Sequence, residues 1–432
     1  MSIIHDIPAI IKILLVFVVI LVAIRKSLSL GNAFVLGAVI IGLLFGLTPG
    51  MMVHSMIGSI LMPKTLSLAF VVTLILVLSS SMELGGQMER LLKSFRGLVT
   101  NPRLNLTIFP ALIGLLPMPG GAVFSAPMLK ELGNKSRLRP DQLSFMNYWY
   151  RHIWEYWWPL YPGILLSVTL ASVDLWTIVM FMWPFTIVAF SLGSLSVKGI
   201  DLIHAVGERN KGRSAGPFFK ELIPIILVIF VGLGAGIVIS HIFPGLYTAK
   251  EIGLIIALIM SILYVWFQNG MSADKIRKVV LNPHILKMFY MVLAILVFKG
   301  MLEDSHAVAA LTKEFTEYSV PLVFITIALP FIVGGITGLT IAFVGSTLPI
   351  IVPLVHSTGE DPFMLAYVML VLVSGFMGVM LSPLHLCIIL SNQYFEAPSR
   401  KVYRLIVLPC ICLFTAAFIY FFFVRWIIAR LL

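Results

Sequence analysis

The densest group of ionisable residues inside an apolar part of the chain is Arg151-His152-Ile153-Trp154-Glu155. Arg151 and Glu155 are four residues apart, so on a helix they would share one face and could neutralise each other. Charged side chains at membrane depth are costly and usually face a cavity or a partner. Arg151 could therefore hold an anionic substrate, with His152 or Glu155 taking a proton. The flanking tyrosines and tryptophans equally favour a structural ion pair beside an aromatic belt at the membrane interface.

Two stretches rich in glycine and proline form the second candidate site. Residues 117–121 are expected to be the tip of one hairpin, and residues 334–340, continued by 345–347, the tip of another. Non-helical backbone inside a membrane leaves N–H and C=O groups that protein, water or a ligand must satisfy. The alternative is a kinked structural helix that packs through small residues. The predicted substrate-binding residues are Pro119, Gly120, Gly121, Arg151, His152, Thr337, Gly338, Thr340, Ser346 and Thr347.

A third group surrounds Pro383, at a predicted break in a helix. His385 follows this proline and could exchange a proton near neutral pH, although a histidine in an apolar helix is more often only hydrogen bonded. Serine and threonine hydroxyls of the second hairpin tip could also ligate a cation or hold a carboxylate. No cofactor and no metal are expected beyond a coupling Na⁺ or H⁺. The residues assigned to the coupling ion or proton are Glu155, Ser382, His385 and Asn392.

Hydrolytic chemistry has no recognisable residue pattern in this chain, so no catalytic residue is assigned. The sequence contains neither HExxH nor GxSxG, and the histidines and glutamate at membrane depth do not form a metal-binding pair along the sequence. The three cysteines make no paired metal-ligand spacing and are expected to pack as small hydrophobic residues. A membrane-embedded enzyme is therefore disfavoured. The cysteines are Cys387, Cys410 and Cys412.

The elements that must position these residues are membrane helices. Of the 432 residues, 59% are hydrophobic and 11% are charged, which is too apolar for a water-soluble core. Long apolar runs without alternation argue against a β-barrel, and the net charge of +11 reflects basic cytoplasmic loops rather than nucleic-acid binding. The segments expected to cross the bilayer lie near 7–24, 30–47, 66–81, 175–194, 221–242, 251–267, 286–302 and 402–424.

The two halves of the chain repeat each other. Residues 50–122 match residues 270–342 at a constant offset of 220, with glycine, proline, glutamate and lysine among the coinciding positions. Further along, residues 159–167 match 383–391, where the offset has grown to 224. In both halves a proline interrupts a stretch longer than one crossing, 141–172 and 362–395, so each helix should be broken at depth. Such duplicated and interrupted halves are typical of secondary transporters, and fit a channel less well.

Charge predicts how the halves are oriented. Basic residues flank 104–130 on both sides, so both ends face the cytoplasm and the segment is a re-entrant hairpin. Acidic loops at 303–319 and 356–361 flank a second hairpin, 320–355, which should enter from the opposite face. We therefore predict an all-α polytopic membrane protein with about ten transmembrane helices and two re-entrant hairpins in an inverted repeat. Its parts would be residues 1–194, a cytoplasmic linker at 195–220, and residues 221–432.

Two segments, 115–122 and 147–159, resemble an uncharacterised prokaryotic branch of the ion transporter superfamily. That superfamily includes divalent-anion/sodium symporters, the large subunit of tripartite periplasmic transporters, and gluconate-type permeases. The resemblance implies a homodimer whose transport domain moves like an elevator, coupled to Na⁺ or protons. The Ser-Asn-Thr tips of the dicarboxylate carriers are replaced here by residues 120–122 and 345–347.

These observations predict a cation-coupled secondary active transporter in the inner (cytoplasmic) membrane. Its expected partners are the lipid bilayer, a small organic anion and a second copy of the chain. No nucleic-acid partner is expected. A sodium/proton antiporter without an organic substrate is the alternative function.

Overall fold

The computed structural model of the chain describes residues 7–95, 98–99, 101–118, 120–135, 138–196, 215–246, 248–318 and 320–431. All regular elements in these ranges are helical, which confirms the predicted all-α fold. The helices of the first half are α2 (Ala9–Arg25), α3 (Leu30–Leu44), α4 (Pro49–Leu61), α5 (Pro63–Leu84), α6 (Gln87–Phe95), α7 (Pro102–Gly114), α8 (Ala122–Lys135), α9 (Pro140–Arg151), α10 (Pro162–Ala171), α11 (Leu175–Met182) and α12 (Pro184–Ser196).

The second half begins with two long apolar helices. Its elements are α13 (Gly216–Ile242), α14 (Ala249–Gln268), α15 (Ala273–Val280), α16 (Pro283–Asp304), α17 (Ala307–Glu317), α18 (Leu322–Thr337), α19 (Thr340–Ser357), the 3₁₀ turn η1 (Asp361–Phe363), α20 (Met364–Leu381), α21 (Leu386–Phe395) and α22 (Ser399–Leu431).

Eight helical segments of the described residues are long and apolar enough to cross a bilayer, which makes the chain a multi-pass membrane protein. The predicted crossings at 7–24 and 30–47 form α2 and α3, which are shorter, at 17 and 15 residues. The outer helices expose large apolar side chains such as Phe230 and Ile237 of α13. In a membrane these side chains would meet lipid rather than water. The predicted linker at 195–220 falls mostly outside the described residues.

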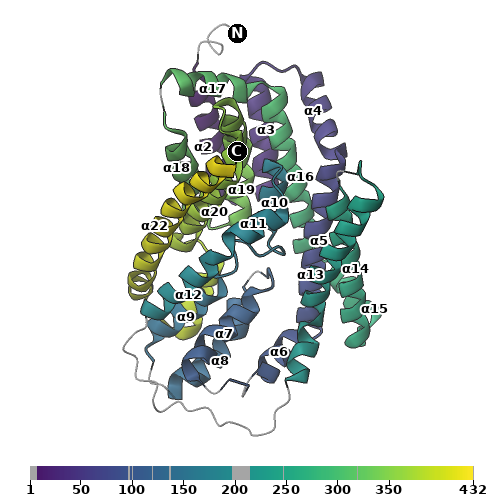
Figure 1. The fold of residues 1–432 in the computed structure, drawn as a ribbon, viewed down its shortest axis with the longest axis vertical. Coiled ribbons are helices and arrows are strands. Elements are labelled where there is room, and N and C mark those ends of the chain that lie inside the picture. Colours follow the sequence, from purple (N-terminus) through teal and green to yellow (C-terminus); the bar gives the residue numbers. More distant parts are fainter. Residues whose placement is uncertain are drawn as a thin grey trace.

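The internal repeat is visible in the helix boundaries. Helices α5 and α16 are both 22 residues long and begin and end 220 residues apart. Helices α10 and α21 are both 10 residues long and lie 224 apart. Figure 1 shows α6 at the lower end of the molecule and its counterpart α17 at the upper end. Corresponding helices of the two halves therefore lie at opposite ends of the molecule, which is the placement that an inverted repeat requires.

Each half contains one helical hairpin and one broken helix. In the first half α7 packs on α8, and in the second α18 packs on α19. Figure 1 places the first pair in the lower half of the molecule and the second in the upper half. The broken helices are α9/α10, interrupted at residues 152–161, and α20/α21, interrupted at 382–385. Prolines 159, 162 and 383 lie in or next to these breaks, where each removes a backbone donor.

Glycines allow α18 and α20 to cross in backbone contact. A Cβ atom on Gly334 would lie 2.2 Å from the Gly375 carbonyl oxygen, and one on Gly378 would lie 2.1 Å from the Phe331 carbonyl oxygen. Neither backbone atom can move aside without separating the helices. This contact is the close approach that small residues permit between membrane helices.

Gly378→Ala should therefore destabilise the protein by about 1–3 kcal/mol, the usual cost of overpacking. The measurement is the melting temperature of purified protein in detergent. The matched control is Gly335→Ala, because Gly335 lies in the same crossing but a Cβ there would meet its nearest atom at 3.7 Å. Equal melting temperatures for the two variants would contradict the close-packing interpretation.

Candidate functional site

A cavity of about 190 Å³ lies where the hairpin tips and the two broken helices meet α3 and the longer helices α5 and α16. Pro117 and Met118 line it from the first tip, and Leu339 and Thr340 line it from the second. Both interrupted segments also open onto it. Its polar lining comes from Arg151, His152, Glu155, Tyr161, His284, Thr340, His385 and Cys387.

Arg151, the last residue of α9, is a buried cation with unused hydrogen-bond donors. Its side chain is 3% exposed, and Nη2 donates to the Met118 carbonyl oxygen at 2.6 Å. Its Nε and Nη1 groups are buried without a hydrogen-bond partner. Leaving donors of a buried charged group unpaired costs at least about 1–3 kcal/mol. An anion in the cavity would satisfy them, which is the role predicted for Arg151.

Glycines of the first hairpin determine where Arg151 lies. A Cβ on Gly121 would lie 2.5 Å from Nη1 of Arg151, and one on Gly114 would lie 2.1 Å from the Arg151 carbonyl oxygen. The guanidinium therefore occupies the space that a side chain at position 121 would fill. The predicted tip residue Gly121 thus packs against the guanidinium of Arg151 and does not line the cavity.

Glu155 contacts the second hairpin tip and His152. Its Oε2 atom lies 3.4 Å from the Thr340 hydroxyl, and its Oε1 atom lies 3.6 Å from Nε2 of His152. The expectation that Arg151 and Glu155 share a helical face is wrong, because α9 ends at Arg151 and turns follow. The helix ends eight residues before the proline at 159, where Gly114 of α7 passes close to the Arg151 carbonyl oxygen.

His152, His385 and Cys387 form a cluster that sequence reasoning missed. One donor atom from each side chain lies within 4.8 Å of the other two, and all three residues are buried. The two imidazole rings are 4.9 Å apart at their centroids. The spacing His-x-Cys at the second break was a usable signal, but only the fold brings position 152 beside position 387.

The aromatic residues near Arg151 have a structural role inside the protein. The indoles of Trp154 and Trp158 donate to the carbonyl oxygens of Ala111 and Leu115 at 2.8 and 2.9 Å. Tyr161 donates to the carbonyl oxygen of Gly114 at 2.6 Å. These bonds satisfy acceptors that the end of α7 leaves free. The interpretation as an aromatic belt facing lipid is wrong, since Tyr148, Trp149, Tyr150 and Tyr156 are wholly buried.

Three of the predicted hydroxyl residues of the second hairpin bond within their own helices. Ser346 and Thr347 donate to the carbonyl oxygens of Ala342 and Phe343 at 2.8 and 2.7 Å, and Thr337 donates to that of Val333 at 2.8 Å. None of these three hydroxyl residues lines the cavity.

The remaining predicted residues are structural neighbours of the site. Gly120 and Gly338 have positive φ angles, 72° and 66°, which glycine adopts without strain. Ser382 accepts from the Leu384 N–H at 3.2 Å, and Asn392 accepts from the Ser144 hydroxyl at 2.6 Å. Pro119 lies outside the described residues.

Comparison with known proteins relates the chain to a solved transporter structure and to a protein family. The chain is similar to the YdaH transporter of Alcanivorax borkumensis, described as having an unusual topology, with a TM-score of 0.60 and 14% sequence identity. The alignment covers 86% of this chain and 87% of that one. No curated protein matches the sequence. Residues 9–424 match the family described as a protein of unknown function (DUF401), and the chain therefore belongs to the DUF401 family.

Proposed function

We propose that the protein is a cation-coupled secondary active transporter of a small organic anion. The observation that carries this proposal is Arg151, a cation buried at the meeting point of both hairpin tips with two donor groups unpaired. A guanidinium is the group best suited to hold a carboxylate, because its planar N–H groups match the two oxygens. The similarity of the fold to that of the YdaH transporter supports the same function.

The arrangement of the cavity supports alternating access. The inverted halves each contribute a tip and a break to one site, so a movement of hairpins and broken helices past α3, α5 and α16 would carry the site with it. We propose that this movement is of the elevator type in a homodimer. The membrane is proposed to be the inner membrane, as the basic loops predict.

The alternative is a sodium/proton antiporter, and one observation favours it. Glu155 and Thr340 present a carboxylate oxygen and a hydroxyl oxygen to each other at 3.4 Å, and hard cations prefer oxygen ligands. In that case Arg151 would balance charge without holding a substrate.

Ligand-dependent melting of purified protein, followed by uptake into liposomes, separates the two functions. At an anion concentration about 100-fold above its Kd, the bound state gains about 2.7 kcal/mol and melts at a higher temperature. We expect such a shift with sugar acids or with di- or tricarboxylates, and accumulation of the active anion under an inward Na⁺ or proton gradient. Shifts with Na⁺ and pH alone, combined with Na⁺/H⁺ exchange, would assign the antiporter function instead.

A further inference from the structure

We propose that His152, His385 and Cys387 form a binding site for a borderline-soft metal ion such as Zn²⁺. The three donor atoms lie within 4.8 Å of one another. With bond lengths of about 2.0–2.3 Å, tetrahedral ligands of zinc are about 3.3–3.8 Å apart. Side-chain rotations that move the donor atoms by about an ångström would therefore bring them to the distances that zinc requires. Two imidazoles and a thiolate suit zinc, whereas Na⁺ and Mg²⁺ prefer oxygen.

The hydrogen bonds of His152 leave one ring nitrogen available to a metal. Nδ1 lies 2.5 Å from the Tyr148 carbonyl oxygen, which can only accept, so Nδ1 carries the proton. The other nitrogen, Nε2, presents its lone pair and has no hydrogen-bond partner although it is buried. An imidazole fixed by a backbone carbonyl through one nitrogen is the usual support for a metal-binding histidine.

His385 provides a second unpartnered nitrogen from the opposite half of the repeat. Its Nδ1 atom is buried without a hydrogen bond, and the side chain is 8% exposed. Cys387, two residues on at the start of α21, is buried and makes no disulfide. Buried polar atoms are normally paired, so an unpartnered ring nitrogen on each histidine of this cluster indicates a missing partner. A metal ion satisfies all three at once.

The charges around the site are compatible with a divalent ion. Binding releases the Cys387 proton, because the thiolate is the ligand. The thiolate and the Glu155 carboxylate, which lies 3.6 Å from His152, offset the two positive charges of the metal. Three protein ligands leave a fourth position open, as in zinc sites that take a water or a solute. The donors of Arg151 line the same cavity.

Cobalt spectroscopy on the metal-free, tag-free protein tests this site without any transport assay. Co²⁺ should produce a thiolate-to-cobalt charge-transfer band that saturates at about one equivalent per chain and disappears when Zn²⁺ is added. Cys387→Ser should abolish the band. The matched control is Cys410→Ser, because Cys410 is equally buried but lies in α22, outside the cluster. His152→Ala and His385→Ala should each weaken Zn²⁺ binding by roughly 100-fold or more. Removing a ligand should cost more affinity than removing a residue that only supports a ligand through a hydrogen bond.

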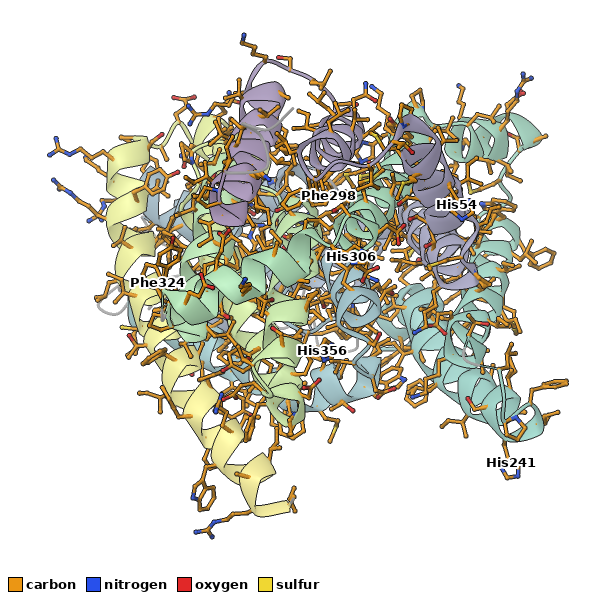
Figure 2. The ribbon with its side chains drawn as sticks, turned by 90° about the horizontal axis from the view of Figure 1, so that it is seen from above. His54, His241, Phe298, His306, Phe324 and His356 are labelled. Atoms are coloured by element: carbon orange, nitrogen blue, oxygen red, sulfur yellow. The ribbon has the colours of Figure 1, made fainter. Side chains whose placement is uncertain are left out.

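The spectrum of the wild-type protein alone can reject the metal site. The test therefore gives a result even if a variant fails to fold. Cobalt that binds without the charge-transfer band would occupy exposed histidines instead, such as His241, which Figure 2 shows at the outer edge of the molecule. That result, or a band that persists in Cys387→Ser, would reject the site. Because no anion is present, a negative result here would leave the transport proposal standing, and a failure of transport would leave the metal site standing.

Discussion

Replacing Arg151 with alanine should lower anion uptake into liposomes by about 30- to 1000-fold, the consequence of losing about 2–4 kcal/mol at a buried charge pair. The residue is 3% exposed, and Arg151 is the one arginine or lysine among the described residues that line the cavity. The substrate anion would then be buried without a counter-charge. Initial uptake rates at several anion concentrations measure the effect.

Two further variants separate binding from folding. Arg151 also donates to the Met118 carbonyl oxygen, so its removal could loosen the first hairpin tip. Arg151→Lys keeps the charge but not the planar pair of donors, and should give an intermediate loss. Arg139→Ala is the matched control, since Arg139 precedes the same helix and its own side chain is exposed, outside the cavity, where it pairs with Asp141. Arg151→Ala protein that melts normally and transports at the wild-type rate would remove Arg151 from the proposed site.

The fold could be predicted from the sequence because prolines and glycines determine helix boundaries locally. Pro63 and Pro283 each occupy the first turn of a 22-residue helix, where proline is tolerated. The same residues reveal the repeat, and an odd number of crossings in each half implies inversion. Hydropathy was less informative for α2 and α3, which are shorter than a bilayer requires.

The details of the site depend on contacts between distant residues, which a single sequence does not show. Helix α9 ends at Arg151, beside Gly114 of α7, and not at the nearest proline along the chain. Ser346 and Thr347 looked like ligands because of their type, but each hydroxyl donates to its own helix, which is a common alternative for serine and threonine in apolar surroundings. Cys387 was expected to be only a small hydrophobic residue, because His152, which lies in the same cluster, is far away along the chain.

Gly121→Ala should reduce anion uptake by roughly 10- to 100-fold with little change in melting temperature, because a misplacement of about 1 Å can cost that much at a functional site. The added Cβ would lie 2.5 Å from Nη1 of Arg151, the far end of a flexible side chain, so the guanidinium moves and the backbone does not. Gly114→Ala instead meets the Arg151 carbonyl oxygen at 2.1 Å and should lower the melting temperature. Gly58→Ala, with no atom within 4 Å, is the control. If Gly121→Ala transports normally, the position of the guanidinium does not matter, and an anion held by Arg151 is excluded.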